Sequence, residues 1–457
     1  MPTTATRSEK TSTNPFLNLN FAPVQSEQLI TELSVSGQIP LELEGRFLRI
    51  GPNPLKAPNP KSYHWFMGSG MVHGLRLKDG KAQWYKNNYV LSENVTAALH
   101  KKALPTPRKT HGGNVNTNVL SIGGELFALV EAGSLPIKLD ADLQSVAYSD
   151  FKGTLKHGFT AHPHKDHATG EIHAIAYAFD KKTVDYLVID KEGRSRTAAQ
   201  IAVPHQPMIH DMAFTKSFAI LLDLPVTFSM TTAISGKFPY VWNRKQQPRI
   251  GFIPRKIEDA GKVIWIEAPS CGVYHVMNAY ETTDRIILDV VKNSMNFDSE
   301  ILKREPKQNT LVRWTINLTD GKLVETQLSD YSVEFPRINE RLFGQEYNFG
   351  YTACLTKDVK FGPLYKHDLS KGTTIVRDLG KGRSAMEPVF VPRNNANTED
   401  DGWLMSYVFD ENTNNTDVII LDAQKFQCDP VAVIHLPVRV PYGFHGNWIA
   451  DSDLQTV

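Results

Sequence analysis

Four histidines of the 457-residue chain lie in apolar sequence settings that suit metal ligation. His162 follows Phe159-Thr-Ala, His210 follows Met208-Ile, and His275 lies within Val273-Tyr-His-Val-Met-Asn278. His445 lies between two glycines in Tyr442-Gly-Phe-His-Gly446, where the backbone can approach another group closely. The separations are much longer than those of zinc fingers, so distant parts of the fold must bring the imidazoles together. We expect these four side chains to meet at one metal ion.

Three glutamates also adjoin residues that ought to be buried. Glu131 follows the apolar run Leu126–Val130, Glu334 precedes Phe335, and Glu387 precedes Pro388-Val-Phe-Val. A buried carboxylate is costly unless it is paired, and a metal-bound histidine needs a partner for its second ring nitrogen. The acids therefore suit hydrogen bonds to the histidines, although ion pairs with Arg337 or Arg393 are an alternative. In the nearby run His162-Pro-His-Lys-Asp-His167, we expect His164 and His167 to be exposed.

The composition is that of an ordinary globular chain, with 41% hydrophobic and 22% charged residues. A formal charge of +1 argues against a nucleic-acid partner. Three scattered cysteines favour a reduced, cytoplasmic protein. No signal peptide or membrane-spanning segment is expected. Residues 1–12 predict a disordered N-terminal tail, and residues 13–457 a single catalytic domain.

Short apolar runs separated by turn signals predict an all-β fold. Predicted hairpins occupy Leu75–Tyr85, Glu171–Ile189, Thr310–Leu328 and Trp403–Leu421, and Gly123-Gly124 joins two more strands. Helices are expected only around Gln28–Leu33 and Glu93–Lys102. Hairpins that continue without a linker favour a single β-propeller, with the histidines on inner strands of different blades.

Motifs along nearly the whole chain are similar to those of the carotenoid cleavage oxygenase family. They occur in the family's order and are Gly45-Arg-Phe-Leu-Arg-Ile-Gly-Pro-Asn-Pro54, Gly68-Ser-Gly-Met-Val-His73, Asn116-Thr-Asn118, Ala128-Leu-Val-Glu-Ala-Gly133, Ala161-His-Pro163, His210-Asp-Met-Ala-Phe-Thr215, His275-Val-Met-Asn-Ala-Tyr-Glu281, Glu334-Phe-Pro-Arg337, Glu387-Pro-Val-Phe-Val-Pro-Arg393 and Gly443-Phe-His-Gly446. One departure is Phe66-Met-Gly-Ser-Gly70, where relatives often carry an acidic Asp-Gly-Asp-Gly turn; we expect it to affect loop structure more than chemistry.

The resemblance implies a seven-bladed propeller whose short helices and loops cap the active-site face. It implies an iron(II) ion, Fe(2+), bound by His162, His210, His275 and His445, with Glu131, Glu334 and Glu387 hydrogen-bonded to three of them. Thr117 would crowd one open position of the metal and steer dioxygen to the other. The implied reaction is oxidative cleavage of a carbon–carbon double bond by dioxygen, which gives two carbonyl products.

The substrate implied by the family is a lipophilic polyene held in an apolar tunnel. Aromatic candidates for the tunnel wall near the ligands are Phe159, Phe214, Tyr274, Phe335 and Phe444. Relatives that act on phenolic stilbenes carry a lysine where this chain has Val130, so we expect a carotenoid or apocarotenoid. The same iron site acting on a stilbene or phenylpropanoid alkene is the alternative, with Tyr89 to receive the phenol. An isomerase or hydrolase of the same family, or a propeller that only binds ligands, are further alternatives.

A lipophilic substrate also suggests peripheral contact with a membrane. Residues 221–242 combine Leu221–Met230 with Phe238-Pro-Tyr-Val-Trp242, and the basic pair Arg244 and Lys245 follows. Aromatic and basic residues of this kind favour the membrane interface. Burial of the same segment as a strand and its covering loop is the alternative.

Overall fold

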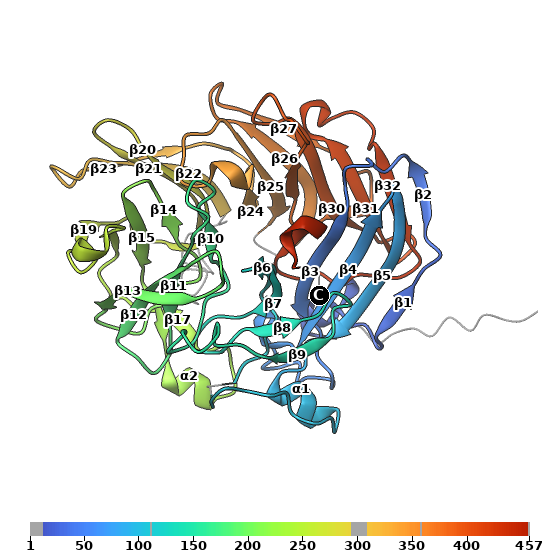
Figure 1. Cartoon of the computed structure of the whole chain (residues 1–457), viewed down its shortest axis with the longest axis horizontal. Coiled ribbons are helices and arrows are strands. Elements are labelled where there is room, and N and C mark those ends of the chain that lie inside the picture. Colours follow the sequence, from blue (N-terminus) through green and yellow to red (C-terminus); the bar gives the residue numbers. More distant parts are fainter. Residues whose placement is uncertain (1–11, 110–111, 294–308, 357–358, 456–457) are drawn as a thin grey trace, which may run out of the picture.

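The computed structural model describes residues 12–109, 112–293, 309–356 and 359–455. The chain forms a seven-bladed β-propeller, in which seven antiparallel sheets follow one another around a ring (Figure 1). Residues 1–11 of the predicted tail lie outside the described residues. No helix in the described ranges is long and apolar enough to cross a membrane.

Five of the sheets are built from consecutive stretches of the chain. Their strands, grouped by sheet, are β6 (Asn118–Ile122), β7 (Glu125–Leu129), β8 (Ile137–Leu139) and β9 (Ser145–Tyr148); β10 (His164–Lys165), β11 (Ile172–Tyr177), β12 (Thr183–Ile189) and β13 (Ser195–Ala202); β14 (Ala213–Phe214), β15 (Phe218–Asp223), β18 (Arg249–Pro254) and β19 (Ile264–Glu267); β20 (Gly272–Glu281), β21 (Ile286–Asn293), β22 (Asn309–Ile316) and β23 (Leu323–Gln327); β24 (Val333–Arg337), β25 (Phe349–Leu355), β26 (Phe361–Asp368) and β27 (Thr373–Arg377). A separate two-stranded ribbon, β16 (Val226–Phe228) and β17 (Tyr240–Trp242), is inserted between β15 and β18.

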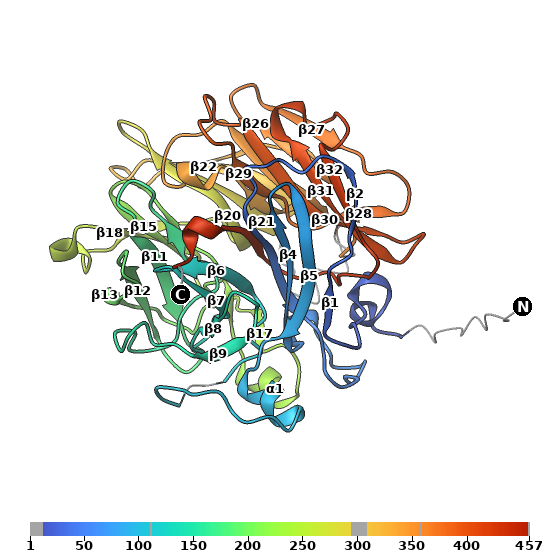
Figure 2. The same ribbon diagram turned by 45° about the vertical axis from the view of Figure 1, so that its right-hand side comes forward.

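The two remaining sheets close the ring, because each combines strands from both ends of the chain (Figure 2). One sheet contains β1 (Gln28–Ile30), β5 (Lys81–Tyr89), β4 (Gly70–Lys78), β3 (Gly45–Pro52) and β33 (Gly446–Ala450); the other contains β2 (Ser34–Gly37), β32 (Ala432–Leu436), β31 (Asn415–Asp422), β30 (Gly402–Asp410), β28 (Arg383–Ala385) and β29 (Val389–Pro392). The closing pair β3 and β33 needs glycine, since a Cβ on Gly446 would lie 2.3 Å from the Leu48 carbonyl oxygen. Arg49 also donates a hydrogen bond to the Gly443 carbonyl at 2.8 Å.

The predicted hairpins are confirmed. β4–β5, β11–β12, β22–β23 and β30–β31 pair as expected, and β6 turns into β7 through two glycines with positive φ. The predicted helix at Gln28–Leu33 is wrong. Gln28 instead pairs with Asn87 on the edge of β5, where its N–H also donates to the Asn87 side chain at 2.7 Å.

Short helices lie along the lower edge of the ring in Figure 1. The predicted helix near residue 93 is present as α1 (Glu93–Ala98), shorter than expected, and α2 is Met230–Ile234. The described 3-10 turns are η1 (Pro15–Leu17), η2 (Leu19–Phe21), η3 (Trp65–Met67), η4 (Ile257–Asp259), η6 (Glu340–Leu342), η7 (Ala423–Lys425) and η8 (Asp451–Asp453).

Some histidines other than the four metal-ligand candidates are buried inside the blades. His367 on β26 is 1% exposed, and its ring nitrogens lie 2.9 Å from the Thr352 hydroxyl and 3.0 Å from the Thr374 hydroxyl. Burial lowers the pKa of His367 to about 4. The folded protein therefore holds this ring neutral over a range in which the unfolded chain protonates it.

The pH dependence of stability tests this burial. Because the folded pKa lies below the usual value, the stabilisation is complete above about pH 6.5 and is lost as the pH falls toward 4. His367→Gln should make the decline in unfolding free energy shallower by about 1.4 kcal/mol per pH unit between pH 6 and 5. The pH dependence of the thermal unfolding midpoint measures this change. The exposed His157→Gln is the control, and an equal change in both variants contradicts the assignment.

Candidate metal centre

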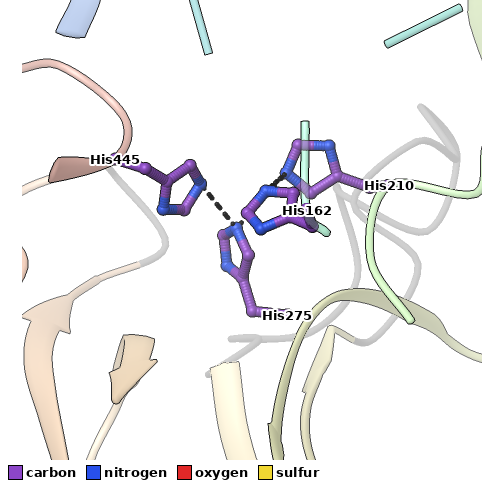
Figure 3. A group of neighbouring side chains, drawn as sticks. All are labelled: His162, His210, His275 and His445. Atoms are coloured by element: carbon purple, nitrogen blue, oxygen red, sulfur yellow. Dashed lines mark hydrogen bonds between the residues drawn. The ribbon is translucent and has the colours of Figure 1, made fainter. Parts of the chain in front are cut away.

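The four candidate histidines converge in the described structure (Figure 3). His162 immediately precedes the sheet that begins with β10, His210 precedes β14, His275 lies in β20, and His445 directly precedes β33. The Nε2 atoms are 3.1 Å apart for His162 and His210, 3.3 Å for His210 and His275, and 3.0 Å for His275 and His445. One ligand atom from each of the four lies within 4.8 Å of the others.

This spacing fits a single metal ion. Imidazole nitrogens bind such metals at about 2.0–2.1 Å, so two ligands at right angles lie about 3 Å apart. The three neighbouring pairs have that separation. Four neutral nitrogen ligands suit iron, copper, nickel or zinc, and an octahedral ion would keep two positions for other ligands.

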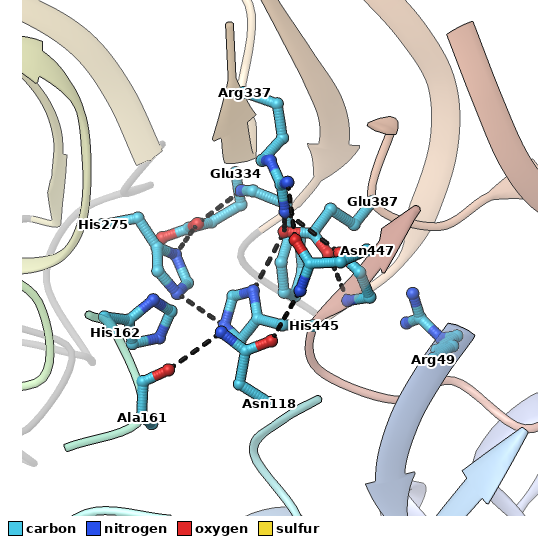
Figure 4. Close-up of polar contacts among 12 residues, drawn as sticks. Arg49, Asn118, Ala161, His162, His275, Glu334, Arg337, Glu387, His445 and Asn447 are labelled. Atoms are coloured by element: carbon cyan, nitrogen blue, oxygen red, sulfur yellow. Dashed lines mark hydrogen bonds and ion pairs between the residues drawn. The ribbon is translucent and has the colours of Figure 1, made fainter. Parts of the chain in front are cut away.

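Three glutamates fix the outer nitrogens of three of these rings, and Figure 4 shows two of the pairs, His275 with Glu334 and His445 with Glu387. Nδ1 of His210 lies 2.7 Å from Glu131, Nδ1 of His275 lies 2.5 Å from Glu334, and Nδ1 of His445 lies 2.9 Å from Glu387. When each Nδ1–H donates to its carboxylate, the Nε2 lone pair is left for the metal. Among the described residues, no carboxylate hydrogen-bonds to the His162 ring.

Burial and charge act in opposite directions at these pairs. Burial lowers the pKa of His162 well below its usual range and lowers that of His445 to about 4, although Glu387 acts against the latter shift. Burial would lower the pKa of His275 too, but the charge and hydrogen bond of Glu334 outweigh it and raise the pKa. Burial opposes ionisation of Glu387, yet His445 and Arg337 hold its pKa down at about 2. The centre therefore combines ionised acids with imidazoles that can bind a cation.

Irregular backbone aims these groups at the axis. The pairing of β20 with β21 shifts register between Val273 and Val276, the stretch that contains His275, and the pairing of β24 with β25 shifts after Glu334. Phe335 has a φ of 54°, a left-handed conformation that is strained for a bulky residue. This turn lets the Phe335 N–H donate to Glu334 at 2.6 Å and stacks the Phe335 ring against His275.

Two cavities border the histidine cluster. The larger has a volume of about 770 Å³ and reaches His210, His275 and His445 from a wall rich in aromatic side chains. The smaller, about 70 Å³, reaches His162, His275 and His445 and is lined by polar groups including Asn118, Arg337 and Glu340. The centre therefore borders a large, mainly apolar cavity and a small cavity of mixed lining.

The larger cavity is lined by three of the five predicted tunnel residues and by the predicted Thr117, and it excludes the other two tunnel residues. Thr117, Tyr274, Phe335 and Phe444 line it together with Glu131 and Glu334. Phe159 lies instead in a blade core against Phe151, and Phe214 packs beside Phe343 and the Arg255 guanidinium. Both lie close to a ligand in sequence, but their side chains are not among those that line this cavity.

Two other expectations change. The Tyr89 hydroxyl accepts a hydrogen bond from Asn53 at 2.6 Å and packs with Met71 and Val95, away from the cavity lining. His164 was expected to be exposed, but its side chain is only 14% exposed, because the ring bonds to Asp211 and stacks on Phe343. His167 is exposed, as predicted.

Two aromatic residues that the sequence analysis did not assign to the tunnel, Phe66 and Phe238, extend the cavity wall from the predicted Tyr274 and Phe444 toward α2. Phe66 contacts Phe444 at 5.4 Å and Tyr274 at 6.0 Å between ring centroids, and Phe238 lies 5.1 Å from Phe66. All four rings line the larger cavity. The departure at Phe66–Gly70 therefore bears on the cavity wall as well as on the loop. The aromatic residue Phe66 was the feature of the sequence that could have indicated this role in the cavity wall.

Comparison with known proteins agrees with this architecture. The model of the retinal pigment epithelial membrane protein family (RPE65) matches residues 21–450. A carotenoid cleavage oxygenase of Mycobacterium tuberculosis is 38% identical over 98% of this chain and 99% of its own length. The chain belongs to this family, that of the carotenoid cleavage oxygenases.

Solved structures share the fold. The lignostilbene dioxygenase of Pseudomonas brassicacearum superposes with a TM-score of 0.85 at 23% identity, covering 97% of this chain and 100% of that one. The cobalt-substituted apocarotenoid oxygenase (ACO) of Synechocystis gives a TM-score of 0.79 at 24% identity, covering 94% of this chain and 96% of that one.

Metal retention tests the roles of the acids. His275→Ala removes a ligand and should abolish stable iron binding. Glu387→Gln keeps the shape but loses the charge beside His445, so it should weaken iron retention by about 10–100-fold. Metal analysis after dialysis against a chelator measures both effects. Glu340→Gln, which changes a half-buried acid paired with Arg337, should retain iron like the parent protein; full retention by His275→Ala contradicts the ligand assignment.

Proposed function

We propose that this chain uses one iron(II) ion, held by His162, His210, His275 and His445, and dioxygen to cleave a double bond of a carotenoid or apocarotenoid. The carbon–carbon double bond breaks, and each of its carbons gains one oxygen atom, so that two carbonyl products form. The observation that carries the proposal is the convergence of four imidazoles, three of which line a large aromatic cavity.

The iron, when bound, supplies the activation of dioxygen. The protein orients the metal ligands and binds the substrate. Glu131, Glu334 and Glu387 keep three Nδ1 atoms protonated and three Nε2 atoms directed inward. No side-chain nucleophile is required, because the chain's task is to bind and orient the alkene and to exclude water.

The cavity suits a long apolar molecule. Its volume of about 770 Å³ lies within the range of ligand pockets, and apolar walls favour a polyene over water. Tyr274 and Phe335 contact the histidines and Phe444 precedes His445 in the chain, so these rings would hold the reacting part of the substrate there. The Thr117 side chain lines the same space, and the Thr117 carbonyl accepts a hydrogen bond from the His445 N–H at 3.2 Å. We assign Thr117 the role of limiting the room beside the metal.

A stilbene substrate is the second candidate. Tyr177 and Tyr240 are among the residues that line the cavity, and their rings would suit contact with the aromatic rings of a stilbene. Val130, which is partly buried against an apolar cluster, supplies no charge there, so the apocarotenoid remains the first candidate.

Product analysis separates the two candidates. The iron-loaded protein should convert an apocarotenal into two shorter carbonyl compounds and should turn over a hydroxystilbene much more slowly. Mass spectrometry of both reactions provides the measurement. Removal of iron with a chelator should stop the reaction, and added iron(II) should restore it while added zinc should not. Faster cleavage of the hydroxystilbene favours the second candidate, and activity without metal contradicts both.

We also propose peripheral membrane contact, but through a smaller surface than residues 221–242 as a whole. Leu221, Leu222 and Leu224 are buried in the core. The exposed apolar residues of this segment are Met230, 60% exposed, and Ile234, 80% exposed, on α2. Thr232 of α2 and Phe238 just after it line the cavity, so a docked α2 would place the cavity beside the lipid. The predicted cytoplasmic location remains a prediction.

Charge on α2 tests this contact. Replacing both Met230 and Ile234 with Glu should reduce binding to liposomes, because two charges would have to enter the interface. Flotation with lipid vesicles measures the bound fraction. Val324→Glu, at a 46% exposed position on β23 away from α2 in Figure 1, is the control. Parent protein that stays entirely in the soluble fraction contradicts the proposal.

A further inference from the structure

A buried carboxylate outside the three glutamates lies at the junction of three ligand-bearing segments. Asp211 is 6% exposed and makes three hydrogen bonds. Oδ1 accepts from the Met212 N–H at 2.7 Å and lies 2.7 Å from Nε2 of His164, and Oδ2 accepts from the Val276 N–H at 2.8 Å. An ionised carboxylate can only accept, so the His164 ring is the donor in its contact.

Each contact involves a different part of the metal centre. His164 lies two residues after His162, Asp211 itself follows His210, and Val276 follows His275. The rings of His210 and His275 each have a glutamate, whereas the described structure gives the His162 ring no carboxylate. Its segment is fixed instead through His164, which is held on its face by Phe343 at 4.0 Å between centroids and on its edge by Asp211.

We propose that Asp211 is a positioning residue for the metal centre, which holds the segments of His162, His210 and His275 at the separation that one metal ion requires. The proposal rests on the proposed metal-binding function. Asp211 does not touch the metal; it acts through the backbone on either side of the ligands. Hydrogen bonds to a carboxylate are stronger than those between neutral groups, and in a buried setting each one restricts the segment that donates it.

The substitution Asp211→Asn is informative because every group that Asp211 meets is a donor. The amide has nearly the same shape, but one of its two ends is an NH2 group. Whichever way it is turned, that NH2 faces an N–H that was satisfied before. The variant therefore loosens at least one ligand-bearing segment without creating a cavity, and a buried donor is left unpaired.

Asp166→Asn is a matched control. Asp166 is also buried, lies in the segment that follows His162, accepts from the Ala168 N–H at 2.9 Å, and forms an ion pair with Arg255. Its partners belong to no other ligand-bearing segment, so its loss should affect stability without altering the metal geometry. His164→Phe is a second variant, because it keeps a ring against Phe343 while it removes the bond to Asp211.

Cobalt(II) is the probe, because its visible absorption bands report coordination geometry. The parent protein is loaded with cobalt, its spectrum is recorded, and release into excess chelator is timed; the thermal midpoint of each apo protein is measured alongside. Asp211→Asn should change the spectrum and release cobalt about 10–100-fold faster. His164→Phe should do so by up to about 10-fold, and Asp166→Asn should keep the parent spectrum and release rate.

The outcomes are distinct. If Asp211→Asn or His164→Phe folds and binds cobalt with the parent spectrum and release rate, Asp211 has only a structural role and the inference is overturned. If Asp211→Asn fails to fold, His164→Phe alone decides. If Asp166→Asn alters the spectrum as much as Asp211→Asn, the effect is general and the inference is again overturned. A parent protein that binds neither cobalt nor iron overturns the proposed metal function itself.

Discussion

The structure depends on a balance of charge along the propeller axis. Three carboxylates and four imidazoles share a buried region, and neither set is stable there without a partner. Each glutamate receives a hydrogen bond from one histidine, and the inward nitrogens of the histidines lie close enough to repel unless a cation lies between them. Arg337 adds a further positive charge beside Glu387 at 3.3 Å. The arrangement would therefore suit a dipositive ion. The glutamates behind the histidine ligands would balance its charge without contacting it.

The β-propeller suits this arrangement because equivalent ends of different blades meet on one axis. Four of the seven blades each contribute one ligand at or just before an inner strand, so that a short stretch of backbone fixes every imidazole. The same geometry leaves space beside the cluster, where a large aromatic cavity and a small cavity of mixed lining both reach the histidines.

Much of this could be predicted from the sequence, because the signals are local. Turn residues such as Asp79-Gly80 and Thr319-Asp-Gly321 fix hairpins within a few residues, and His445 lies in a short motif with its glycines. The predictions that failed were decided by contacts between residues that are distant in sequence. Gln28 became an edge strand because β5 offered free backbone groups, and His164 was buried by Asp211 and Phe343, which are distant in sequence. Phe159 and Phe214 are near ligands along the chain, yet their side chains pack away from the cavity. Phe66 and Phe238 line it instead. No local sequence pattern reports packing between blades.

The pairing of β3 with β33 has a consequence for the order of events during synthesis. His445 immediately precedes β33, so the fourth ligand reaches its place only when the last strand has docked beside one made near the beginning. A ribosome-bound chain that has exposed six blades still offers an incomplete ligand set. The four histidines can therefore meet at one site only after β33 has docked, and a metal ion bound there would tie the C-terminal segment to the middle of the polypeptide.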